Sequence, residues 1–220
     1  MSNYHIKNLE EYFQVYRRST RNPEVFWEEI AEEHFIWRQR WDKVMEWDKA
    51  KAEIKWFQGA KLNVTENCID RHLRIRGEKP AIVFEPNDRD EPAQVITYNE
   101  LHRRVCKFAN VLKNQGIKKG DRVCIYLPMI PELAIAVLAC ARIGAVHSVV
   151  FAGFSSAALA TRINDSKCKM VITSDGSYRG TKTIDLKTIV DNALKECSCV
   201  KRVLVAKRIH SKITDRKSVV

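Results

Sequence analysis

The later part of the chain alternates between short apolar runs and helical segments, and this alternation limits the fold more than any other feature. Four runs rich in β-branched residues are expected to be strands, at residues 123–127, 146–150, 170–173 and 202–206. The segments between them have the apolar spacing and end signals of helices, at residues 132–143, 156–165 and 186–196. Strands separated by helices form parallel sheets covered on both faces. The sequence therefore predicts the α/β class, with a mostly parallel sheet flanked by helices.

Residues 1–62 differ in composition from the rest and are expected to form a separate extension. All five tryptophans lie there. Helical spacing predicts one helix around residues 9–16, and Asn22-Pro23 predicts the start of a second. Residues 37–57 are aromatic but only weakly periodic, which predicts an extended segment. We expect this aromatic-rich amino-terminal extension to pack on the sheet domain that begins at residue 63.

The net charge of +11 is concentrated near the end of the chain, where residues 201–220 hold seven Lys or Arg and one Asp. Such a segment fits either a nucleic-acid contact or one strand followed by a solvated loop. No aromatic residue is available there to stack on bases. This absence favours the solvated loop, and no nucleic-acid partner is expected.

Cysteine usage and hydropathy fit a cytosolic or organelle-internal protein, and a cytoplasmic location is expected. Residues 1–20 lack the apolar core of a secretory signal, and the apolar run at residues 133–141 is too short to cross a bilayer. The seven cysteines include no CxxC pair. We therefore expect reduced thiols, no metal site and no membrane partner.

Two segments at the carboxyl ends of predicted strands are candidates for ligand binding. The turn Phe151-Ala152-Gly153 lets a ligand approach the backbone, just before a helix that Ser155 or Ser156 would cap. The expected loop 174–182 contains Arg179 and Lys182, which could hold a phosphate, although surface cations in a solvated loop would look the same. No GxxxxGK[ST], GxGxxG or nucleophile–base pair occurs, so no catalytic residue is assigned. His147, inside an apolar run, is expected to be a buried core histidine.

Several stretches together resemble one family. They are WFQGAKLNVTENCIDRHL at 56–73, ITYNELHRRV at 96–105, the segment 118–163 that contains HSVVFAGFS, and VITSDGSYRGTKTIDLK at 171–187. These stretches are similar to the amino-terminal part of the AMP-forming acetyl-CoA synthetases, within the acyl-adenylate-forming superfamily. The resemblance implies that residues 1–62 are that family's amino-terminal extension. It also implies that residues 63–220 are the first, incomplete part of its large AMP-binding domain.

The resemblance implies a two-step reaction in the parent protein. Acetate attacks the α-phosphate of ATP, with Mg²⁺ neutralising charge, to give acetyl-adenylate and pyrophosphate. Coenzyme A then displaces AMP from the adenylate to give acetyl-CoA. The family's coenzyme A nucleotide site maps onto Phe151, Ala152, Gly153 and the run Arg179-Gly180-Thr181-Lys182. Two departures stand out. Ala152 replaces a familiar glycine, and Lys182 replaces a familiar arginine, which keeps the charge but loses the bidentate fork.

The family's phosphate loop, acyl pocket and catalytic lysine match no stretch of these 220 residues. We therefore expect the ATP and Mg²⁺ sites to lie in a carboxy-terminal remainder, and the chain alone to be inactive. Two alternatives stay open. The parent protein could be a propionate–CoA ligase, or the chain could be a stand-alone module that binds coenzyme A or another nucleotide without catalysis.

Overall fold

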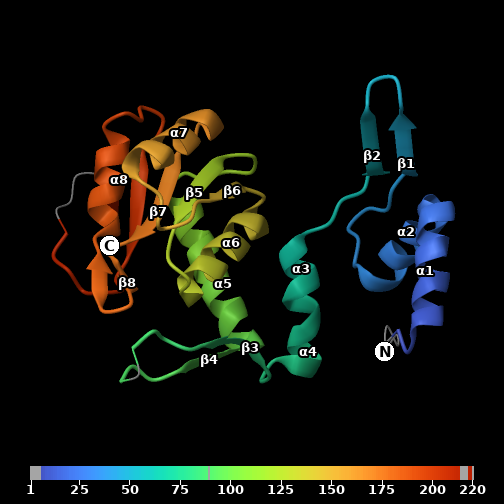
Figure 1. The fold of residues 1–220 in the computed structure, drawn as a ribbon, viewed down its shortest axis with the longest axis horizontal. Helices are drawn as coiled ribbons and strands as arrows, with labels where there is room; N and C mark the ends of the chain where they lie inside the picture. The colour runs from blue at the N-terminus through green and yellow to red at the C-terminus, as the bar shows by residue number, and fades with distance from the viewer. Residues whose placement is uncertain (1–5, 89, 214–217, 220) are drawn as a thin grey trace. The chain divides into compact units, whose positions relative to one another are not determined.

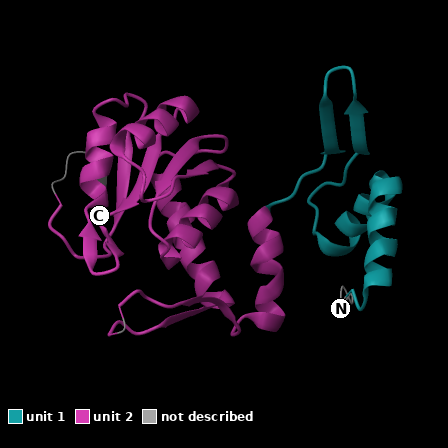
Figure 2. Cartoon of the chain, in the orientation of Figure 1, with its two compact units in different colours: residues 1–63 teal, residues 64–220 magenta. Residues whose placement is uncertain are grey.

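The computed structural model describes residues 6–88, 90–213 and 218–219. The chain divides into two compact units, Met1–Asn63 and Val64–Val220 (Figure 2). Part of the basic segment that the sequence singles out, residues 214–217 and 220, lies outside the described residues.

The first unit consists of two helices and a β-hairpin. Helix α1 (Leu9–Arg21) begins where the Asn8 side chain accepts a hydrogen bond from the Glu11 amide at 2.8 Å. Helix α2 (Pro23–His34) has its proline in the first turn, as predicted. Strands β1 (Lys43–Asp48) and β2 (Glu53–Gln58) pair antiparallel. The prediction of one extended segment over residues 37–57 was therefore wrong in part. The weak periodicity of this region gave no sign that two strands pair within it.

The aromatic residues of this unit contact one another. The rings of Trp37, Trp41 and Phe57 lie 5.0–5.6 Å apart between centroids, in tilted and edge-on arrangements. Both indole groups have acceptors, since Trp37 donates to the Ala31 carbonyl at 2.9 Å and Trp41 to Glu28 at 3.1 Å. These satisfied rings form a small core of their own. The predicted packing of the unit on the sheet stays a prediction.

The second unit contains the parallel sheet (Figure 1). It opens with three short helical turns, α3 (Val64–Cys68), the 3₁₀ turn η1 (Asp70–His72) and α4 (Leu73–Arg76). An antiparallel hairpin follows, formed by β3 (Pro80–Phe84) and β4 (Gln94–Thr97). Helix α5 (Tyr98–Asn114) then begins at an N-cap, where the Thr97 side chain accepts a hydrogen bond from the Glu100 amide.

From this point the chain alternates between strands and helices as predicted, except for two short strands between residues 177 and 184 and a further strand at residues 218–219. The elements are β5 (Arg122–Tyr126), α6 (Pro131–Ile143), β6 (Val146–Val149), α7 (Ser156–Ser166), β7 (Met170–Ser174), β8 (Ser177–Arg179), β9 (Lys182–Ile184), α8 (Leu186–Leu194), β10 (Arg202–Ala206) and β11 (Ser218–Val219). The main sheet has the order β11-β10-β7-β5-β6, and its strand pairs are all parallel. The predicted α/β class is confirmed.

Both faces of the sheet carry a hydrophobic core. Along β5, Val123 and Ile125 join the cluster that includes residues of α5 and α6, whereas Cys124 and Tyr126 join the cluster that includes residues of α7 and α8. This alternation is what a strand buried on both faces requires. It explains why the strands read as continuous apolar runs in the sequence.

Strand β6 is an edge strand, and its side chains are the main exception to the predicted burial. Val146 and Val149 are 52% and 50% exposed. His147 is also exposed, so the prediction of a core histidine was wrong. An apolar run predicts a strand, but it does not distinguish a central position from an edge.

The state of the cysteines agrees with the expectation of reduced thiols. All seven cysteines are free, and four of them, Cys124, Cys140, Cys168 and Cys197, are buried. Burial raises the pKa of the Cys124 and Cys140 thiols to about 12, so these groups behave as small apolar side chains. Among the described residues, no helix is long and apolar enough to cross a membrane.

Candidate functional site

The carboxyl ends of the parallel strands lie at one edge of the sheet, and the candidate segments follow them. Residues 150–155 leave β6, and residues 175–184 leave β7 (Figure 1). Strand β5 lies between these two strands, in register with both. Since neighbouring strands are about 4.8 Å apart, the two segments begin roughly 10 Å from each other. An edge of this kind is where open α/β sheets bind ligands.

The turn after β6 is held by three hydrogen bonds. The Val150 amide donates to the Ile125 carbonyl at 2.9 Å, which continues the parallel ladder. The Phe154 amide donates to the Phe151 carbonyl at 3.0 Å and closes the turn. The hydroxyl of the fully buried Tyr126 donates to the Phe154 carbonyl at 2.7 Å. The core of the sheet therefore fixes the backbone of the turn.

This fixed turn leaves an aromatic ring facing solvent. Phe151 is 70% exposed and contacts Phe154 edge-on, with 5.9 Å between ring centroids. A Cβ atom on Gly153 would lie 2.4 Å from the Phe151 ring, so glycine is needed for this ring position. Ala152 packs instead against the core cluster on the α7 and α8 face. The turn thus presents an aromatic surface beside the start of α7, where Ser155 forms the predicted cap.

The segment predicted to be a loop after β7 is instead a third β-hairpin, after β1–β2 and β3–β4. Strands β8 and β9 pair antiparallel, and Gly180 and Thr181 form the two-residue turn between them. Gly180 has a φ of +61°, which suits the left-handed backbone that such tight turns require. The predicted loop was wrong because a glycine, hydroxyls and cations are also typical of exposed hairpins.

The hairpin places two cations on one of its faces. Arg179 and Lys182 are direct partners in the antiparallel register, and both are exposed. Within the described ranges, neither side chain has a recorded ion pair. Like charges directly opposite each other destabilise a pair of strands. An anion bound between Arg179 and Lys182 would remove this repulsion, and phosphate has the charge and oxygens to do so.

The base of the hairpin is tied to the sheet by one buried carboxylate. Asp175 is 1% exposed and directly follows β7. Its two oxygens accept hydrogen bonds of 2.7–3.1 Å from four backbone amides, those of Gly176, Arg208, Ile209 and Ser211. Asp175 therefore joins the start of the hairpin to the segment that follows β10.

These contacts change the acidity of Asp175. Desolvation by burial, the largest single influence, raises its pKa, but the four amide donors together lower the pKa below its ordinary value. A carboxylate with a lowered pKa stabilises the folded state at pH values above the pKa that it has in the unfolded chain, about 4. That stabilisation is lost as the pH falls through the folded-state pKa.

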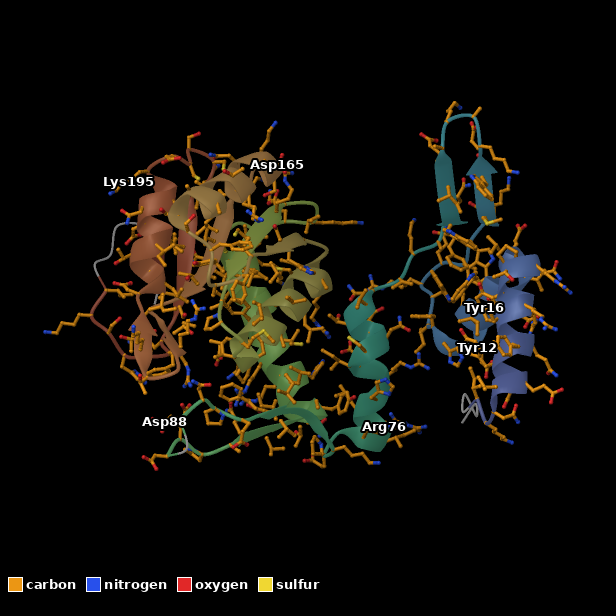
Figure 3. All side chains as sticks on the ribbon, in the orientation of Figure 1. Tyr12, Tyr16, Arg76, Asp88, Asp165 and Lys195 are labelled. Atoms are coloured by element: carbon orange, nitrogen blue, oxygen red, sulfur yellow. The ribbon has the colours of Figure 1, made fainter. Side chains whose placement is uncertain are left out.

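Stability is therefore expected to fall on acidification partly through Asp175. Urea unfolding at pH 7 and below pH 4 should give a larger drop in unfolding free energy for the wild-type chain than for Asp175→Asn, which has no carboxylate to protonate. Asp165→Asn, at an exposed position on α7 (Figure 3), serves as the control and should keep the wild-type drop. An equal drop in Asp175→Asn and wild type would contradict this assignment.

Two residues that the sequence analysis missed support the hairpin. Asp175 lies within the predicted loop 174–182, where the sequence gives it no role. An Asp-Gly pair directly after a buried strand is nevertheless typical of a turn that the Asp side chain closes by accepting from the backbone. Arg208 lies in the segment interpreted as a solvated loop. Its side chain is 16% exposed and forms an ion pair with Glu91, so that interpretation was wrong at this residue. No sequence pattern would have found this contact, because 117 positions separate the two residues.

Comparisons with known proteins agree with this architecture. The model of the family "AMP-binding enzyme" matches residues 69–218, and that of "acetyl-coenzyme A synthetase N-terminus" matches residues 12–68. An acetyl-coenzyme A synthetase of Alkalilimnicola ehrlichii is 53% identical over 90% of this chain and 30% of its own length. One of Magnetococcus marinus is 56% identical over 86% of this chain and 29% of its own length.

A solved structure, an acetoacetyl-CoA synthetase from Streptomyces lividans, superposes with a TM-score of 0.84 at 26% identity. It matches 92% of this chain and 31% of that protein. The chain thus spans about 30% of the length of the curated relatives that it matches. Since the first family model covers most of the second unit, the chain belongs to the AMP-binding enzyme family.

Proposed function

We propose that this chain contributes part of the coenzyme A site of an AMP-forming acetate–CoA ligase. The observation that carries the proposal is the cation pair Arg179 and Lys182, at the same edge of the sheet as the exposed Phe151 ring. The names of relatives more than 50% identical support acetate as the acid. Acetate, ATP and coenzyme A are the substrates, and a carboxy-terminal remainder of the protein is the partner that completes the enzyme.

In this proposal each element of the site has a separate task. The Phe151 ring offers a flat apolar surface against which an adenine can stack. Gly153 leaves room for the Phe151 ring beside the backbone, and Ala152 anchors the turn in the core. Arg179 and Lys182 bind the 3′-phosphate, while Gly180 and Thr181 form the turn that sets them opposite each other. These residues bind and orient the second substrate, and that binding energy assists the transfer step.

The acyl-adenylate chemistry is assigned outside these residues. Mg²⁺ belongs to the ATP step of the proposed reaction, and we place the ATP and Mg²⁺ sites in the carboxy-terminal remainder. A cytoplasmic location is part of the proposal, and the seven free cysteines support it.

Binding of coenzyme A by the 220-residue chain tests the proposal. Titration calorimetry of the wild type should show tighter binding of coenzyme A than of 3′-dephospho-coenzyme A. Arg179→Ala should weaken coenzyme A binding by about tenfold to a hundredfold, since it removes charge-assisted hydrogen bonds to the phosphate. The affinity for dephospho-coenzyme A should change little.

Arg202→Ala is the matched control, because Arg202 is an exposed arginine at the opposite, amino end of the parallel strands. It should leave both affinities unchanged. Equal affinity of the wild type for the two ligands, or no binding of either, would overturn the proposal.

A further inference from the structure

The β8–β9 hairpin needs support from outside itself. Each of its strands has three residues, and a two-stranded hairpin alone is marginally stable in water. Its turn places Arg179 opposite Lys182, which adds electrostatic repulsion. If this cation pair is to bind a phosphate, some other group must hold the hairpin in place.

Arg208 makes contacts that can supply this support. Its guanidinium lies 5.3 Å from the centroid of the Tyr178 ring, within the hairpin, and 5.7 Å from that of Phe84 in β3. The same group forms a bidentate ion pair with Glu91, with distances of 2.6 and 2.7 Å, in the connection between β3 and β4. Arg208 thus joins the two hairpins through one planar side chain.

The backbone of Arg208 is fixed as well. Its amide donates to Asp175 at 2.7 Å, and Asp175 also accepts from the amide of Gly176, the residue just before β8. Side chain and main chain therefore both connect Arg208 to the hairpin. Both Nη atoms of Arg208 donate to Glu91, and the Arg208 side chain is only 16% exposed. Arg208 is therefore placed to hold the hairpin rather than to bind a ligand.

The geometry of the hairpin keeps this contact apart from the cation pair. Successive residues of a strand point to opposite faces, so Tyr178 lies on the face opposite to that of Arg179 and Lys182. Ile184 shares the face of the cations, and it packs on the same core cluster as Ala152. Arg208 therefore contacts one face of the hairpin, while Arg179 and Lys182 lie exposed on the other.

We propose that Arg208, with Glu91 and Tyr178, is a positioning residue that holds the β8–β9 hairpin so that Arg179 and Lys182 face a phosphate group together. This inference rests on the proposed function for the identity of the ligand. It adds residues that do not touch the ligand but determine how well the cation pair binds it. The arrangement couples the β3–β4 hairpin to a site more than 80 residues further along the chain.

Hydrogen exchange of the 220-residue chain tests the positioning role without any ligand. In Arg208→Gln, the backbone amides of residues 177–184 should exchange about tenfold faster than in the wild type, while those of the central strands β5 and β7 should be unchanged. Arg208→Lys keeps the charge but loses the planar fork, and it should give an intermediate rate. Tyr178→Leu repeats the test at a 40% exposed position, where the core is left intact.

Arg142→Gln is the matched control. Arg142, in α6, forms a bidentate pair with Asp70, in η1, at 3.1 and 2.8 Å. Its loss should leave the exchange of residues 177–184 unchanged. Wild-type exchange of these amides in both Arg208→Gln and Tyr178→Leu would overturn the inference, and equally faster exchange throughout the unit would reduce Arg208 to a general stabilising role.

Calorimetry then separates the inference from the proposed function. The Arg208→Gln variant should lose most of the preference for coenzyme A over 3′-dephospho-coenzyme A while keeping its affinity for the latter. A wild type without that preference would refute the proposed function, and the exchange rates would still decide whether Arg208 holds the hairpin. A full preference in Arg208→Gln, despite faster exchange, would overturn the link between positioning and phosphate binding.

Discussion

Asp175→Ala is expected to lower the unfolding free energy of the second unit by about 3–5 kcal/mol, one of the two largest effects predicted for this chain. The carboxylate is 1% exposed and accepts hydrogen bonds from four backbone amides. Alanine would leave these amides without that acceptor. Each buried donor left unsatisfied lowers the unfolding free energy by the full desolvation penalty of that group. The segment after β10 and the start of β8 would lose their shared attachment.

Urea unfolding at pH 7, followed by circular dichroism, measures this effect. Asp175→Asn should recover part of the loss, because its side-chain oxygen can still accept from some of the amides but carries no charge. Asp165→Ala is the comparison. Asp165 is exposed on α7, so its removal should cost less. A loss below about 1 kcal/mol for Asp175→Ala would show that water replaces the carboxylate.

Tyr126→Ala is expected to have a similar effect, about 3–5 kcal/mol, for a different reason. The ring is completely buried in the core between the sheet and the helices α7 and α8. Truncation removes the apolar contacts of a large side chain and leaves a cavity that surrounding residues fill only in part. It also removes the hydroxyl that supports the Phe154 carbonyl.

The conservative variant separates these two contributions. Tyr126→Phe keeps the ring and removes only the 2.7 Å hydrogen bond, so it should cost about 1–2 kcal/mol. Stability by urea unfolding should rank wild type above Tyr126→Phe and Tyr126→Phe above Tyr126→Ala. A Tyr126→Phe variant as unstable as Tyr126→Ala would mean that the hydroxyl, rather than ring packing, dominates.

The hydroxyl that Tyr126→Phe removes also links the core to the proposed site. It donates to the turn that presents Phe151, although Tyr126 and this turn are distant in the sequence. Sequence patterns identified the strand and the turn separately, since each has a local signal. The contact between them depends on how α7 packs on the sheet, which no local pattern encodes.

The candidate site illustrates the same division. The residues Phe151 and Gly153, and the cations Arg179 and Lys182, were identified from their place after predicted strands and from the family resemblance. Their mutual arrangement was not. A loop was predicted where the structure has a hairpin, and only the hairpin register sets the two cations directly opposite each other.

Local physical chemistry therefore determined the elements and their class. Alternating apolar runs, an N-cap at Thr97 and a left-handed glycine at Gly144 act over a few residues, so the order of strands and helices is readable from the sequence. The same holds for the two helices of the first unit, which have their own start signals.

Only the tertiary structure decided which positions are central and which groups meet. His147 has an apolar sequence neighbourhood but lies on an edge strand, because strand order depends on the crossovers rather than on the strand itself. Arg208 lies in a basic segment but is held by Glu91 and by two aromatic rings. Burial and pairing are set by residues distant in the sequence, and for this reason the support of the site became visible only in the folded chain.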